Sequence, residues 1–144
     1  MHTFFVVNVD FLRKLRAKIG RVIAVGTTSV RTLESLYYIG VACIEKGEPA
    51  DVDQWMPYAR TYEYSVDQAL EALIAYMENH NMHSLQIGTR IIIVPGYEFK
   101  VVNVLVTNFH QPQSTLLLLI SAFVKGDWHR IYDFALANDF RFLS

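Results

Sequence analysis

The first forty residues alternate between helical and extended patterns of apolar side chains. Apolar positions at helical spacing cover residues 11–19, and Gly20 follows as a natural stop. Residues 21–25 form a short apolar run rich in β-branched side chains, as in a buried strand. After a break, a second helix with apolar positions from Val30 to Tyr37 is expected to end at Gly40. Strand, tight turn and helix in this order form half of an α/β unit.

The rest of the chain predicts a helix, two strands and two further helices. Ser65 and Gln68 have the spacing of a capping box, which opens a helix with Val66, Leu70, Leu73, Ile74 and Met77 facing inward. Residues 90–94 and 99–107 are expected to be strands, joined as a hairpin by a type II turn at Pro95–Gly96. Ser114 is expected to cap a buried helix at 115–124, and a last helical pattern covers residues 131–135. These elements predict one α/β domain with a mixed sheet flanked by helices.

Composition narrows the class of protein. Hydrophobic residues make up 52% of the 144 residues and charged residues 19%, which excludes a disordered segment. The longest apolar stretch, 116–124, is too short to span a membrane. A net charge of −1 argues against a dedicated nucleic-acid-binding module, and the basic cluster between residues 13 and 21 fits a solvated helix face. The single cysteine, Cys43, fits a reducing compartment, so we expect a cytoplasmic protein.

The first candidate site follows the strand at 21–25. It consists of a glycine and three hydroxyl residues at the start of a helix: Gly26, Thr27, Thr28 and Ser29. Free backbone N–H groups and the positive end of the helix dipole suit an anion or a polar ligand there. Arg31 lies in the first turn and would need an acidic partner or a ligand, and Glu34 could be that partner. An ordinary helix cap with a surface ion pair explains the same residues.

The second candidate site follows the strand at 99–107. Its polar loop carries Asn108 and His110 before the expected cap at Ser114. A histidine titrates near neutral pH, so His110 could shuttle protons, although most loop histidines are ordinary surface residues. Both candidate sites begin just past the carboxyl end of a strand, where open α/β sheets bind ligands. No grouping of ligand residues predicts a metal site.

These two motifs resemble the S-adenosylmethionine:tRNA ribosyltransferase-isomerase family. Residues 21–35 resemble its strand-loop-helix almost residue for residue, and 95–100 followed by 107–116 resemble its second signature. Arg141, Phe142 and Ser144 match the start of its C-terminal motif. Within the second signature, Gln111 and Gln113 stand where the family commonly has an apolar and a basic residue.

The resemblance implies an enzyme of queuosine biosynthesis. The family transfers and isomerises the ribosyl group of S-adenosylmethionine, a substrate rather than a bound cofactor, onto 7-aminomethyl-7-deazaguanine in tRNA. His110 and Arg31 would be catalytic. Substrate binding would fall to the strand-helix motif and to the second signature, that is Gly26, Thr27, Thr28, Ser29, Glu34, Pro95, Gly96, Tyr97, Asn108 and Ser114.

The resemblance also implies that this chain is the C-terminal portion of a longer catalytic domain. In the family, that larger domain accompanies an inserted β-rich domain, which is missing here together with an N-terminal segment. The full-length enzyme is expected to be a monomer, whereas the shorter chain could self-associate. Two other classes stay open: a non-catalytic α/β module that binds a nucleotide-like ligand, and a folded chain whose site is incomplete.

Overall fold

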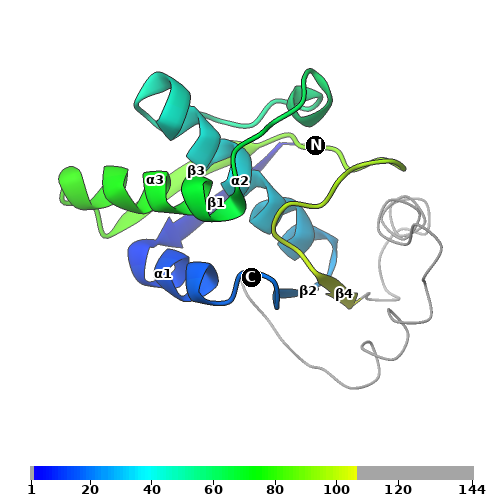
Figure 1. The fold of residues 1–144 in the computed structure, drawn as a ribbon, viewed down its shortest axis with the longest axis horizontal. Helices are drawn as coiled ribbons and strands as arrows, with labels where there is room; N and C mark the ends of the chain where they lie inside the picture. Colours follow the sequence, from blue (N-terminus) through cyan, green and yellow to red (C-terminus); the bar gives the residue numbers. More distant parts are fainter. Residues whose placement is uncertain (1, 107–144) are drawn as a thin grey trace. The chain divides into compact units, whose positions relative to one another are not determined.

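The computed structural model describes residues 2–106 (Figure 1). These residues form two compact units. Of the described residues, the first unit comprises 2–19 and 35–91, and the second comprises 20–34 and 92–106. In chain order the elements are β1 (Thr3–Asn8), α1 (Val9–Ala17), β2 (Ile23–Val25), α2 (Thr27–Lys46), the 3-10 helix η1 (Met56–Tyr58), α3 (Val66–Asn79), β3 (Ser84–Thr89) and β4 (Val104–Val106). The helices expected at 115–124 and 131–135 lie outside the described residues, and the single-domain organisation stays a prediction.

The first unit contains an antiparallel pair of strands, β1 and β3, that the sequence analysis did not anticipate. Val7 pairs with Leu85 and Phe5 with Ile87, and the side chains of Val7 and Ile87 are buried. Aromatic and β-branched residues favour such a pleated, half-buried surface. The opposite face of β1 leaves Phe4 62% exposed, so only one face of this pair contributes to the core.

Helices α1 and α3 begin at side-chain caps. The Oδ1 atom of Asn8 accepts a hydrogen bond of 2.7 Å from the Phe11 amide at the start of α1. The predicted capping box of α3 is confirmed, with Gln68 N–Ser65 Oγ at 3.0 Å and Ser65 N–Gln68 Oε1 at 2.8 Å. The expected inward side chains of α3 are buried except Val66, which is half-buried. Ala69, which was not among the expected inward residues, is also buried.

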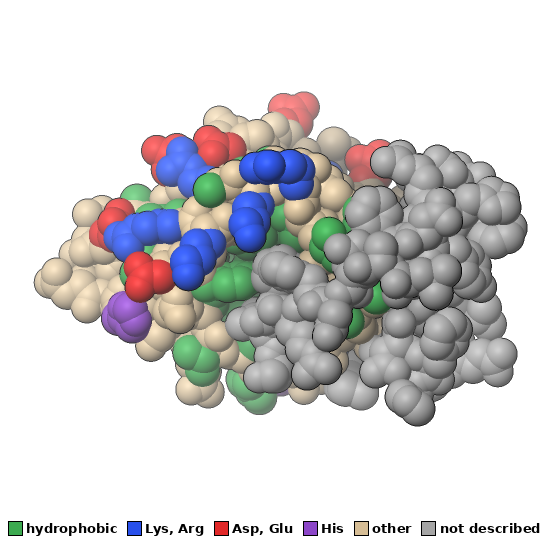
Figure 2. Space-filling view, turned by 90° about the horizontal axis from the view of Figure 1, so that it is seen from below, with side chains coloured by type: hydrophobic (Ala, Val, Ile, Leu, Met, Phe, Trp, Pro, Cys, Tyr) green, Lys and Arg blue, Asp and Glu red, His purple; other side chains and the backbone are tan. Residues whose placement is uncertain are grey.

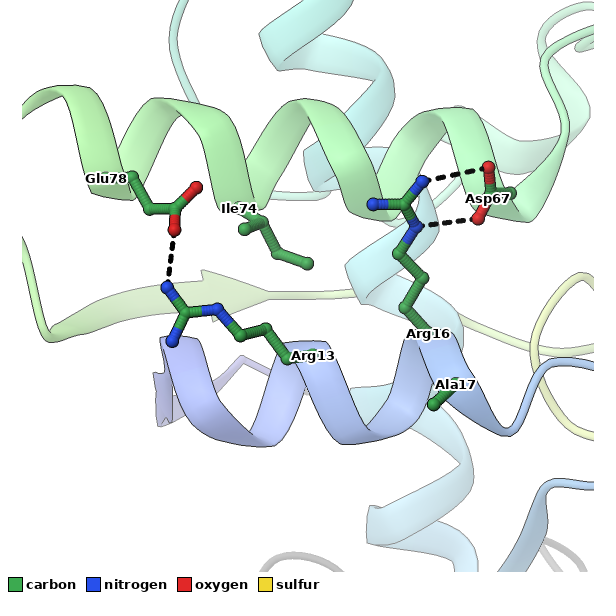
Figure 3. Close-up of a pocket in the computed structure, with 6 residues that line it drawn as sticks. All are labelled: Arg13, Arg16, Ala17, Asp67, Ile74 and Glu78. Carbon is green, nitrogen blue, oxygen red and sulfur yellow. Dashed lines mark hydrogen bonds and ion pairs between the residues drawn. The ribbon is translucent and has the colours of Figure 1, made fainter.

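Ion pairs join α1 and α3 along their exposed sides (Figure 3). Arg13 pairs with Glu78, while Arg16 lies 2.7 Å from Asp67 and 3.2 Å from Glu71. The pairs border a shallow groove of about 500 Å³ that is also lined by Ile74 and Ala17. Figure 2 shows basic side chains with acidic side chains beside them on one face. The basic residues of α1 therefore lie on a solvated helix face, as predicted, and the ion pairs of Arg13 and Arg16 are an addition to that prediction, while Lys18 and Arg21 lie beyond the end of α1.

Helix α2 is longer than the sequence analysis predicted. Its expected end at Gly40 is wrong, because the helix continues to Lys46 and the glycine with a left-handed φ of +81° is Gly47. A Cβ built on Gly40 would stand 2.1 Å from the Ala69 carbonyl oxygen. Glycine at this position therefore permits close helix packing rather than ending the helix.

In the second unit, β2 and β4 pair in parallel, with Val25 beside Val106. The strand expected at 21–25 is confirmed over Ile23–Val25, whereas the expected hairpin is wrong. Residues 90–94 form no strand, and within the described residues the second strand is Val104–Val106 rather than beginning at 99. The turn itself is as predicted: Gly96 has a φ of +95°, and Tyr97 N donates to Val94 O at 3.1 Å.

The hairpin fails because the backbone amides that follow the turn have another acceptor. The amides of Lys100, Val101 and Val102 donate to the side chain of Glu34 in α2, so they cannot pair with a strand at 90–94. The α/β class is confirmed, with both antiparallel and parallel pairing. Within residues 2–106 the strands form two two-stranded sheets. A search of that same part of the chain finds no helix with the length and apolar character of a membrane span.

Candidate functional site

The paired ends of β2 and β4 define the edge on which the first candidate site lies. Gly26 follows β2 with a φ of +86°, and its amide donates to the Val106 carbonyl at 2.9 Å. A residue with a side chain would be strained at this φ. Because β2 and β4 are parallel, their carboxyl ends meet at the same edge, which is the ligand-binding edge of open α/β sheets.

Helix α2 begins at this edge with the three predicted hydroxyl residues. The amide of Val30 donates to Gly26 O at 3.2 Å, which is the first hydrogen bond of the helix. The backbone amides earlier in the first turn come before this bond. Thr27 is half-buried, Thr28 is exposed and Ser29 is buried. Helix-terminal amides together with hydroxyl groups can bind an anion or a polar oxygen.

Arg31 follows the hydroxyl residues in α2 and is half-buried. Partial burial lowers the pKa of its guanidinium from the usual value, because the charged form loses solvation. Glu34 is not the surface ion-pair partner that its spacing suggested, since its carboxylate is fully buried and directed elsewhere. Arg31 therefore supplies positive charge near the start of α2. A hydrogen bond from Arg31 to Glu34 is not needed to explain the position of either residue.

Glu34 binds the loop that follows the Pro95–Gly96 turn. One carboxylate oxygen accepts from Tyr97 Oη at 2.6 Å and from Lys100 N at 2.8 Å. The other accepts from Val101 N at 2.9 Å and from Val102 N at 2.7 Å. Burial raises the pKa of Glu34, while these four hydrogen bonds oppose that rise. Glu34 of the first motif is thus joined through its buried carboxylate to the loop after the Pro95–Gly96 turn, which contains the first part of the second signature.

The loop after the Pro95–Gly96 turn buries its aromatic residue. Tyr97 is 3% exposed and packs edge-on against Phe99, with ring centroids 5.0 Å apart. Pro95 and Gly96 set the chain direction that brings the Tyr97 hydroxyl to Glu34. The predicted residues Gly26, Thr27, Thr28, Ser29, Glu34, Pro95, Gly96 and Tyr97 therefore all belong to one compact unit.

Asn103 is a contributor that the sequence analysis missed. Its Oδ1 accepts from Val22 N at 2.8 Å, while Asn103 N and Val104 N both donate to Val22 O. These bonds align β4 with β2 just before the parallel ladder begins. An asparagine beside an apolar strand could have suggested such a side-chain clamp, although many loop asparagines make none.

Asn108, His110 and Ser114, the remaining predicted site residues, lie outside the described residues. In sequence, the motif that contains them begins one residue after Val106. Across residues 2–106, no three or more His, Cys, Asp or Glu side chains gather in a way that could hold a metal ion.

Comparison with known proteins decides the family. A sequence model of the queuosine biosynthesis protein family matches residues 6–144. The chain belongs to the queuosine biosynthesis protein family. The match spans both motifs and includes His110, so the resemblance read from the sequence is confirmed at the level of the family.

The chain is also similar to a solved structure. The crystal structure of S-adenosylmethionine tRNA ribosyltransferase from Thermotoga maritima is similar at 32% identity and a TM-score of 0.47. The match covers 90% of this chain and 33% of that chain. The chain thus spans about a third of the length of the Thermotoga protein.

Proposed function

We propose that this chain contributes to the transfer of a ribosyl group from S-adenosylmethionine to tRNA in queuosine biosynthesis. The observation that carries the proposal is the contact between the first family motif and the first part of the second, through Glu34 and Tyr97, in the unit in which β2 pairs with β4. The name of the Thermotoga protein gives both substrates for that relative.

The proposed acceptor is the aminomethyl group of a 7-deazaguanine base in the anticodon of tRNA. The ribosyl group would rearrange to an epoxycyclopentane as adenine and methionine leave, giving epoxyqueuosine. The sulfonium of S-adenosylmethionine acidifies the neighbouring ribose carbon, so the reaction needs a base and stabilisation of developing charge.

The proposed roles follow from the chemistry of each residue. His110 handles protons, because histidine is the side chain best suited to proton transfer near neutral pH. Arg31 and the hydroxyl residues Thr27, Thr28 and Ser29 hold oxygen atoms of the donor or acceptor at the positive end of α2. Gly26 permits the turn, Pro95, Gly96 and Tyr97 shape the site, and Asn108 and Ser114 provide polar contacts from the second motif.

The proposal is tested by release of methionine and adenine from S-adenosylmethionine in the presence of acceptor tRNA. Because the chain spans about a third of the Thermotoga protein, the assay compares it with a version that restores the rest of the family's length. We expect release from the longer version, and its loss in a His110→Ala variant of that version. Unchanged turnover in this variant would show that His110 does not handle protons.

The same assay separates the two other classes. Binding of S-adenosylmethionine without release of either product, in both versions, would identify a binding module and overturn the enzymatic proposal. Release from the longer version alone would identify the present chain as an incomplete catalytic unit, because reacting groups need a complete set of neighbours to orient them.

A further inference from the structure

We propose that Glu34 is a positioning residue, which holds the loop 97–102 against α2. It thereby fixes the two elements of the candidate site, the start of α2 and the end of β4. The inference rests on the proposed function, because it assigns how that site is kept in shape. It also separates Glu34 from the residues that touch the substrate.

All acceptor positions of the Glu34 carboxylate are occupied. An ionised carboxylate has about four lone-pair sites, and the four donors of Tyr97, Lys100, Val101 and Val102 lie between 2.6 and 2.9 Å away. The side chain is 0% exposed. A substrate could reach these oxygens only by displacing a hydrogen bond from the loop. Direct contact with substrate is therefore the weaker assignment for Glu34.

The Glu34 carboxylate accepts the backbone hydrogen bonds that a neighbouring strand would otherwise accept. Lys100, Val101 and Val102 present three consecutive amides, and Val101 and Val102 are each 3% exposed. Buried amides without an acceptor destabilise the folded state, so the loop requires an acceptor at this place. Glu34 supplies two oxygens to three amides and to the Tyr97 hydroxyl, which defines the path of the whole loop.

The position of Glu34 in the chain connects this loop to the site. Glu34 lies in the same helix as Thr27–Ser29, and the loop leads directly into β4, whose last residue accepts from Gly26. A shift of the loop would move β4 relative to the start of α2. Glu34 therefore acts on the site through the loop.

The first test measures amide hydrogen exchange in wild-type protein and in Glu34→Gln. Glutamine has the same size but replaces one acceptor oxygen with an NH₂ group that faces two donors. We expect exchange in peptides covering 95–102 to accelerate by about tenfold or more, with little change in α3 peptides. The matched control is Ser35→Ala, which removes the neighbouring buried hydroxyl that lies 2.7 Å from Thr89 Oγ1. It should leave the 95–102 peptides protected.

The second test measures turnover in the longer version that carries the proposed activity. Glu34→Gln should lower kcat about tenfold while changing KM for tRNA less than threefold. Tyr97→Phe retains the three amide bonds to Glu34, so it should keep loop protection and lose less of kcat. Faster loop exchange with unchanged kcat would show a structural role alone and overturn the proposal.

Two further outcomes are decisive. Equal exchange acceleration in α3 and loop peptides would show global destabilisation and also overturn the proposal. If the wild-type longer version releases no product, the proposed function fails, whereas the exchange result still decides whether Glu34 holds the loop. Failure of the inference and failure of the proposed function are therefore distinguishable.

Discussion

Gly40 of α2 lies directly against the backbone of Ala69 in α3. A Cβ built on Gly40 would stand 2.1 Å from the Ala69 carbonyl oxygen and 2.5 Å from its carbonyl carbon. Both distances are far inside van der Waals contact, and the atoms concerned are backbone, which cannot turn aside as a side chain can. The absence of a side chain at position 40 is thus a condition for the packing of the two helices.

We expect Gly40→Ala to destabilise the protein despite the higher helix propensity of alanine. Alanine favours a helix interior over glycine by about 1 kcal/mol. Overpacking against backbone costs roughly 1–3 kcal/mol or more, and here both helices would have to move. The free energy of unfolding, measured by urea denaturation, should therefore fall.

Gly47→Ala provides the matched control. A Cβ at Gly47 would meet nothing within 4 Å, so only the left-handed φ of +81° opposes the substitution. That strain costs about 1 kcal/mol. A larger loss of stability in Gly47→Ala than in Gly40→Ala would contradict the packing explanation.

Gly40 also shows what sequence patterns could and could not predict. Local signals identified α1, α3, β2 and the Pro95–Gly96 turn, because capping, helical periodicity and positive φ depend on nearby residues. The role of Gly40 depends on Ala69, which is distant in sequence. The glycine that resembled the end of a helix is therefore a contact point between two helices. The same reason hid the pairing of β1 with β3, whose partners lie about eighty residues apart.

The candidate site was predictable only in its motifs. Gly26–Ser29 and Pro95–Tyr97 were found from the chemistry of their residues and from family resemblance. The hydrogen-bond donors to Glu34 were not found from the sequence. The spacing to Arg31 suggested a surface ion pair, whereas the true donors are 63 or more positions away. Short apolar runs such as 90–94 fit a strand as well as a buried loop, and the acceptor offered by Glu34 decides between them.

Asn103→Ala should weaken the second unit. The substitution removes the acceptor of the Val22 amide, and Val22 is 1% exposed. Loss of this hydrogen bond should cost about 1 kcal/mol of stability. Hydrogen exchange of peptides covering 20–26 should accelerate accordingly. Asn103→Asp retains an oxygen acceptor and should preserve their protection, and equal acceleration in both variants would refute this role of Oδ1.

The ion pairs between α1 and α3 should be sensitive to salt. Arg16 contacts Asp67 and Glu71 on the protein surface, where ions screen such interactions. Arg16→Gln should lower stability slightly in dilute buffer, and the difference from wild type should shrink in about 1 M NaCl, where the Debye length is roughly 3 Å. Lys14→Gln is the control, because no ion pair of Lys14 is found among residues 2–106. A difference for Arg16→Gln that is independent of salt would indicate packing of its aliphatic stem instead.

Cys43 should react slowly with alkylating reagents in the folded protein. Burial raises the pKa of its thiol from 9.0 to about 11, because the thiolate loses solvation. Only the thiolate is nucleophilic, so at pH 8 the folded chain should react about 100-fold more slowly with iodoacetamide than the chain unfolded in urea. Between pH 8 and 10, the folded rate should rise about tenfold per pH unit. Since the folded state retains this proton more tightly, its contribution to stability is present below pH 9 and is lost as the pH rises through about 11. Mass spectrometry of the alkylated chain gives both rates, and equal rates at pH 8 would show that the thiol is not perturbed.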